Sequence, residues 1–258
     1  MMKTYLSILF VLIAVSRVSF AQEKSAEELA ALAQNPLADL MSFPFQNNST
    51  FGVGEFDRTL NVLNIQPVLP FLNGRLITRT IIPIVSQPVG ENGTRSGVSD
   101  INFTAFYSPP SRGATWGIGP IVVIPTGTDV SSRKLSAGPS LVILKTTVTW
   151  VYGVLVNNIW SLAGDGNAPA VNQFLLQYFV NYNFPGGWYL SSAPIITANW
   201  KATGGNKWTV PFGGGGGKIL RLGSLPLNLQ AQVFYNAVRP DAAGAWSLRL
   251  QAQVLVPK

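Results

Sequence analysis

Polar and apolar residues alternate along long stretches of this chain, and this pattern constrains its fold more than any other feature. The alternation is clear over residues 97–108, 171–184, 225–236 and 245–256. A period of two puts alternate side chains on opposite faces of a β-strand. Ordinary strands have about five or six residues, whereas a tilted strand needs about 9 to 11 to cross a bilayer. Runs of this length therefore predict an all-β fold, a transmembrane antiparallel up-and-down β-barrel.

Turn-like segments divide the chain into eleven clear strands and one weaker strand. The clear strands are expected at residues 59–71, 75–85, 97–108, 115–125, 135–146, 149–161, 171–184, 188–201, 207–221, 225–237 and 245–256. Residues 43–53 supply the weaker strand, which brings the barrel to about 12 strands, an even number as bacterial barrels require.

The connections between these strands alternate in length. Mostly longer, polar connections are expected at residues 86–96, 126–134, 162–170, 202–206 and 238–244. The other connections are shorter, and bacterial barrels place their short turns in the periplasm. We therefore expect the C-terminus on the periplasmic side.

Tryptophan gives an independent indication of a membrane. All seven tryptophans fall near the ends of the expected strands, on the more apolar face: Trp116, Trp150, Trp160, Trp188, Trp200, Trp208 and Trp246. The indole ring prefers the membrane interface because it is apolar and its N–H needs a partner. These residues are predicted to form the two aromatic girdles of a lipid-embedded barrel.

The N-terminus resembles an export signal. Lys3 precedes an apolar stretch at residues 5–15, which is too short to span a bilayer, and residues 19–21 (SFA) have the small-x-small pattern of a cleavage site. The alternative is a buried N-terminal strand. We expect a signal peptide at residues 1–21, a helical leader or plug at 22–41 and the barrel at 42–258.

A short helix is expected at residues 25–34. Ser25 and Glu28 form a capping box, and Asn35-Pro36 ends the helix. This segment either packs in the periplasmic mouth as a plug or remains a mobile leader.

The composition argues against an enzyme. The chain has no His and no Cys, and only 11% of its residues are charged. The commonest general base, the commonest zinc ligand and the cysteine nucleophile are therefore missing. Five glycines at 213–217 are followed by Lys218 and a strand-like run, which is not a phosphate-binding loop; they are expected to permit tight strand curvature or close approach of the N-terminal segment. We predict no catalytic residue, no metal site and no cofactor.

The polar faces of the strands are expected to line the lumen. The candidate lumen residues are Arg75, Arg79, Asp100, Asn102, Gln173, Gln177, Asn181, Arg221, Gln230, Gln232, Arg249 and Gln251. Four arginines against one aspartate predict a lumen that favours anions or neutral polar-aromatic solutes, because low-dielectric walls focus such a field. The alternative is that the arginines only knit the lumen wall together. Twelve strands also predict a restricted lumen, between that of filled eight-stranded barrels and that of wide porins.

Several segments resemble one bacterial outer-membrane family. They are residues 116–120 (WGIGP) with 125–129 (PTGTD), 157–161 (NNIWS), 171–177 (VNQFLLQ), 179–184 (FVNYNF) and 194–200 (PIITANW). The family is labelled transporter-like and is associated with the meta-pathway of phenol degradation; some members are mislabelled neuromedin U. The resemblance extends from about residue 47 to 258. It implies an outer-membrane barrel that moves small, often aromatic, molecules, and it brings no catalytic residues. The chain departs from barrel custom because its end, 256–258 (VPK), lacks a terminal aromatic residue.

These observations predict an outer-membrane channel or transporter for small molecules, reached by export through the inner membrane of a Gram-negative bacterium. Its expected partners are membrane lipid and a small-molecule solute. Nucleic acid is not expected, because the basic residues are dispersed along the chain. Two alternatives stay open: a structural or adhesive barrel that transports nothing, and a soluble periplasmic β-protein that binds apolar ligands.

Overall fold

A computed structural model describes residues 24–256, so the expected signal peptide lies outside the described residues. The helical segments are α2 (Ala26–Gln34), η1 (Pro185–Gly187) and η2 (Gly204–Lys207). The strands are β1 (Met41–Val53), β2 (Arg58–Ile65), β3 (Val68–Phe71), β4 (Leu76–Val89), β5 (Gly93–Val98), β6 (Ile101–Tyr107), β7 (Thr115–Ile124), β8 (Lys134–Thr146), β9 (Trp150–Gly164), β10 (Asn172–Asn183), β11 (Trp188–Ser192), β12 (Ile195–Asn199), β13 (Trp208–Leu222), β14 (Leu225–Val238) and β15 (Trp246–Val256).

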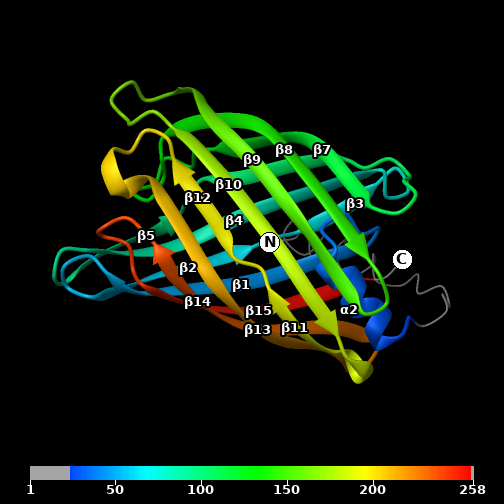
Figure 1. The fold of residues 1–258 in the computed structure, drawn as a ribbon. Helices are drawn as coiled ribbons and strands as arrows, with labels where there is room; N and C mark the ends of the chain where they lie inside the picture. Colours follow the sequence, from blue (N-terminus) through cyan, green and yellow to red (C-terminus); the bar gives the residue numbers. More distant parts are fainter. Residues whose placement is uncertain (1–23, 257–258) are drawn as a thin grey trace, which may run out of the picture.

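The strands form one closed antiparallel barrel (Figure 1). Neighbours in sequence pair with each other, and β15 pairs with β1 from Met41↔Val256 to Phe51↔Trp246. Three positions of the wall are each shared by two segments in line: β2 with β3, β5 with β6, and β11 with β12. The barrel therefore has 12 strand positions, which confirms the predicted fold class and count.

Proline explains two of the three interrupted positions. Pro67 lies between β2 and β3, and Pro194 lies between β11 and β12. Proline has no N–H to donate to the ladder, so pairing lapses there and resumes after it. The sequence pattern predicted single strands at 59–71, 97–108 and 188–201, and this continuity was wrong.

The connection expected at residues 86–96 is also different from the prediction. Pairing of β4 with β5 continues out to Val89↔Gly93, so most of this segment is a β-hairpin with a tight turn at residues 90–92. Gly90 adopts a positive φ of 56° in that turn, which glycine tolerates without steric cost. The polar side chains of residues 86–96 led to the prediction of a loop. A β-ladder can nevertheless extend beyond the membrane, because polar side chains are solvated there.

The two faces of the wall have the predicted parity. Val180 of β10 and Leu250 of β15 are exposed on the outer face, whereas Asn181 and Gln232 are buried on the inner face. Large exposed apolar patches mark protein or membrane contacts in a folded chain. The outer face therefore suits lipid.

The tryptophans lie in two groups at opposite ends of the wall. Trp116, Trp150 and Trp188 are at the short-turn end; Trp160, Trp200, Trp208 and Trp246 are at the long-loop end. Six of them are exposed, and Trp208 is half-buried. The ring centroids of Trp200 and Trp208 are 5.4 Å apart in an edge-on contact.

The glycine run in β13 allows close packing of a tyrosine. Tyr189 of β11 is paired with Gly217 and points inward, and a Cβ at position 217 would overlap its hydroxyl. An aromatic ring covering a cross-strand glycine is a known device of sheets. The close approach predicted for this run thus comes from Tyr189, not from the N-terminal segment.

In the described part of the chain, no helix is long and apolar enough to cross a membrane.

An arginine on the outer face should be far more costly than one on the inner face. Leu250 lies near the middle of β15 and faces outward, so Leu250→Arg should lower the unfolding free energy by about 2–4 kcal/mol in a bilayer. Gln177→Arg, near the middle of β10 and facing the lumen, is the matched control and should cost much less. Urea titration in lipid vesicles measures both, and equal costs would contradict the assigned faces.

Candidate functional site: the lumen cavity

The segment before β1 crosses the short-turn mouth of the barrel (Figure 1). Its helix α2 begins with the predicted capping box, in which Ser25 Oγ accepts from the Glu28 N–H and Glu28 accepts from the Ser25 N–H. Leu29 and Ala30 are buried against Tyr189, Ile219 and Leu255.

Polar contacts hold the same segment to the rim. Glu27 Oε1 accepts from the Gly186 N–H at 2.7 Å, and Gln34 Nε2 donates to Asn183 Oδ1 at 2.8 Å. After the helix, Leu37 packs on the opposite side of the lumen, in the cluster that contains Ile77 and Phe106. The segment therefore reaches across the mouth and anchors on both sides.

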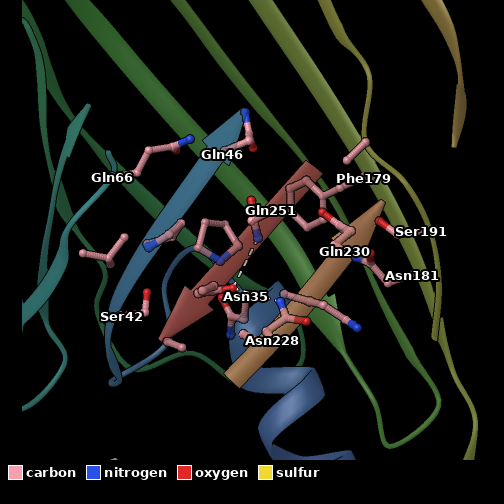
Figure 2. Close-up of a pocket in the computed structure, with 18 of the residues that line it drawn as sticks. Asn35, Ser42, Gln46, Gln66, Phe179, Asn181, Ser191, Asn228, Gln230 and Gln251 are labelled. Carbon is pink, nitrogen blue, oxygen red and sulfur yellow. Dashed lines mark hydrogen bonds between the residues drawn. The ribbon is translucent and has the colours of Figure 1, made fainter. Parts of the chain in front are cut away.

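Above this segment lies a cavity of about 160 Å³ (Figure 2). Ligand pockets usually have about 300–1,000 Å³, so the cavity suits a small solute. Its floor is residues 32–36 with Ala38 and Leu40. Its walls carry many amide side chains from β1, β10, β14 and β15, and Figure 2 shows several of them around the cavity together with Asn35 of the floor.

Arg249 of β15 is the best-anchored charge in this cavity. It is 8% exposed. Its Nε donates to Asn48 Oδ1 at 3.0 Å, and its Nη1 donates to the Ala193 carbonyl at 2.9 Å and to Gln232 Oε1 at 3.2 Å. Its guanidinium also lies over the Phe234 ring, 4.8 Å from the centroid. The Ala193 carbonyl is available because the strand is interrupted at Pro194.

Arg79 of β4 lines the same cavity. Its Nη2 donates to Gln66 Oε1, and Gln66 lies at the interruption between β2 and β3. Arg79 and Arg249 are the two charged side chains that line this cavity. Both arginines are thus held by groups from proline-containing breaks in the wall.

No carboxylate faces these two arginines from the cavity lining. The ion pair between Arg133 and Asp165, at 4.0 Å, lies in the long loops and outside the cavity. Buried charges are normally paired, because desolvation is costly. The cavity therefore carries an excess of positive charge.

Part of the inner wall is apolar. Leu155 and Phe179 line the cavity on β9 and β10, and Figure 2 shows Phe179 across the cavity from Gln66. The cluster continues toward the short-turn end with Val142, Leu144 and Val151. The cavity thus has a cationic side and an apolar side.

The structure brings together about half of the predicted lumen residues. The cavity lining includes Arg79, Gln177, Asn181, Gln230, Gln232, Arg249 and Gln251. Of these, Gln232 and Asn181 are buried and hydrogen-bonded, to Ser191 and to the Val151 carbonyl.

The other five predicted residues lie outside the cavity. Arg75 and Arg221 are exposed at the short-turn rim, where Arg221 donates to the Lys24 carbonyl at 2.6 Å. Asp100 accepts from the Ser132 N–H at 3.1 Å and from the Ser131 hydroxyl, so it holds a long loop. Asn102 lies beside it, and Gln173 is exposed near the long-loop end. Each of these five residues has the sequence parity of the inner face. Parity does not show, however, how far along the barrel axis a residue lies.

Sequence reasoning missed several lining residues. The most important are Gln66, Ser191, Asn228 and Gln253. It also missed Asn48, which binds Arg249. Asn228 and Gln253 have the inner parity of well-patterned strands, so that signal was available. Gln66 precedes a proline at a strand break, where alternation gives no prediction.

Among residues 24–256, no group of three or more His, Asp or Glu side chains is placed to hold a metal ion.

Comparisons with known proteins give structural matches. No protein-family model and no curated protein matches the chain. The structure of the NanC porin matches 84% of this chain and 100% of its own, with a TM-score of 0.56 and 10% identity. An outer membrane channel from Pseudomonas putida F1 matches 84% of this chain and 94% of its own, with a TM-score of 0.59 and 16% identity.

This chain has the 12-stranded barrel fold of those outer-membrane channels. Outer membrane phospholipase A from Escherichia coli also matches, at 11% identity and with a lower TM-score of 0.40.

Acid should loosen the helix at the mouth. The Glu27 carboxyl accepts hydrogen bonds from the backbone N–H of Glu27 itself, from the backbone N–H of Gly186 and from the Ser25 side chain. These hydrogen bonds hold the pKa of the Glu27 carboxyl below its usual 4.5. Because the pKa of Glu27 is lower in the docked helix, its carboxylate stabilises docking fully at a pH above the usual pKa. This stabilisation is lost as the pH falls through the lowered pKa.

Hydrogen exchange of the α2 amides, corrected for intrinsic rates, measures this effect. Protection should fall in acid in the unmodified protein, and Glu27→Gln should remove that part of the pH dependence. Identical pH profiles in the two proteins would refute the role of the Glu27–Gly186 contact.

Proposed function

We propose that this protein is a narrow channel of the bacterial outer membrane that admits small solutes and favours anions. The cavity carries the proposal: it lies within a closed barrel, it is lined by amides, and its two charged residues are both arginines. The N-terminal segment across the mouth limits the size of the solute.

The outer-membrane location is supported by three observations. The outer face is rich in exposed apolar residues, the tryptophans lie in two groups at its ends, and the fold resembles that of known outer-membrane channels. The same exposed surface disfavours a soluble periplasmic protein, since water would contact it. Assignment of residues 1–21 as the signal peptide belongs to this proposal.

Aromatic solutes are a further part of the proposal. They are supported by the resemblance of the sequence to the family associated with phenol degradation, and by the apolar sector at Phe179 and Leu155. Catalysis is disfavoured because the sequence has no His to act as the general base of a serine hydrolase.

Permeation should be limited by size, and the N-terminal segment should set the limit. In liposome-swelling assays, the unmodified protein should pass solutes of the size of acetate and exclude disaccharides. Ala30→Arg, which places a long charged side chain where the native residue is fully buried, should displace the helix and raise the limit. Deletion of residues 24–40 should do the same.

Heat-dependent migration on a denaturing gel provides the control that both variants still form barrels. Folded protein that passes no solute would favour the structural or adhesive barrel instead. General-porin permeability in the unmodified protein would contradict a narrow channel.

Ion selectivity should depend on the lumen arginines. Under a salt gradient in planar bilayers, the reversal potential should indicate anion preference, because the cavity has positive charge without an acid. Arg79→Glu should weaken or reverse this preference. Arg133→Glu, in a long loop paired with Asp165, is the control and should have a small effect.

A further inference from the structure

The arginine pair in the cavity has hydrogen-bonding capacity that the protein does not use. A guanidinium has five N–H donors. Arg79 donates one hydrogen bond, to Gln66, and the Nη2 of Arg249 has no acceptor among the described residues. The guanidinium nitrogens that lack an acceptor are accessible to solvent, since none of them belongs to the buried, unpaired polar atoms of the described residues. The remaining donors therefore face the cavity.

These donors are fixed in position. Arg249 is held from three sides by Asn48, Gln232 and the Ala193 carbonyl, and Arg79 is tied to Gln66. Gln232 is itself bound to Ser191, at 3.0 Å between side chains. A guanidinium that is already ordered loses little entropy when it binds a ligand.

The positive charge of Arg79 and Arg249 would be stabilised by a bound anion. Two like charges in one small cavity, without a carboxylate in the lining, raise the free energy of the empty cavity. The planar fork of arginine matches the two oxygens of a carboxylate. An anion between Arg79 and Arg249 would accept the unused donors and remove the repulsion.

The opposite side of the cavity selects the rest of the ligand. Leu155 and Phe179 line the cavity from β9 and β10, and Figure 2 shows Phe179 across the cavity from Gln66, the residue that binds Arg79. If a strongly hydrated ion such as inorganic phosphate bound here, the apolar surface of Leu155 and Phe179 would remain in contact with the water around the ion. A molecule with one anionic end and an apolar body fits both sides, and the cavity of about 160 Å³ limits it to a small one.

We propose that the cavity is a binding site for a small organic monocarboxylate, with its carboxylate between Arg79 and Arg249 and its apolar body against Phe179 and Leu155. This inference rests on the proposed channel only in placing the site on the solute path. It names the class of solute that is preferred.

Calorimetric titration of the full-length protein in detergent tests the site without requiring transport. The probes are benzoate, phenol, acetate and inorganic phosphate. Benzoate should bind at least about tenfold more tightly than phenol, which lacks the carboxylate. It should also bind more tightly than acetate, which lacks the apolar body. Benzoate binding no tighter than phenol, or weaker than phosphate, would overturn the proposal.

Variants separate the two halves of the site. Arg79→Gln should weaken benzoate binding at least about tenfold and leave phenol unchanged. Phe179→Ala should weaken benzoate and leave acetate unchanged. Arg133→Gln is the control for a lost arginine outside the cavity. If Arg79→Gln does not form a heat-modifiable barrel, Arg79→Lys keeps the charge without the fork and should still weaken benzoate.

The outcomes distinguish this site from the channel. Benzoate binding that depends on Arg79, with no solute permeation, would retain the site and reject the channel. Permeation with benzoate binding unchanged in both Arg79 variants would retain the channel and reject the site.

Discussion

In the hydrocarbon of a membrane, a backbone N–H or C=O must find its partner within the protein, and this requirement governs the whole structure. An open sheet would leave one row of these groups unpaired at each edge. The pairing of β15 with β1, over eleven residue pairs from Met41↔Val256 to Phe51↔Trp246, removes both edges. Once the wall is closed, alternation assigns each side chain to lipid or to lumen, and the interior becomes a separate compartment whose chemistry the sequence can tune.

The interruptions in the wall are where that tuning is concentrated. A regular ladder directs its carbonyls along the sheet, toward the neighbouring strands. Where Pro194 interrupts β11 and β12, the Ala193 carbonyl binds Arg249, and where Pro67 interrupts β2 and β3, Gln66 binds Arg79. The local loss of sheet pairing thereby provides hydrogen-bond acceptors that fix the positions of two charges in the lumen.

Much of this architecture could be predicted from sequence, because a period of two is a local property. The alternation at 171–184, 225–236 and 245–256 identified β10, β14 and β15 and the inner position of Asn181, Gln232 and Arg249. It could not give the depth of Arg75 or Asp100 along the barrel axis, since depth depends on strand tilt and register. It also could not show that Gln66, next to a break, would hold Arg79, because that contact joins different strands. The apolar inner side at Phe179 was hidden because aromatic residues are expected to face lipid.

The position of α2 has a consequence for the order of assembly. The helix precedes every strand in the chain, yet its contacts are to β9, β10, β11, β13 and β14. Gln34 and its partner Asn183 are 149 residues apart, and Arg221 is 197 residues from Lys24. Its docking surface therefore does not exist until late strands have formed, and contacts of such long range are made after local ones. The segment that precedes every strand is thus the last to reach its place, and before it docks the short-turn mouth of the barrel is wider than in the finished protein.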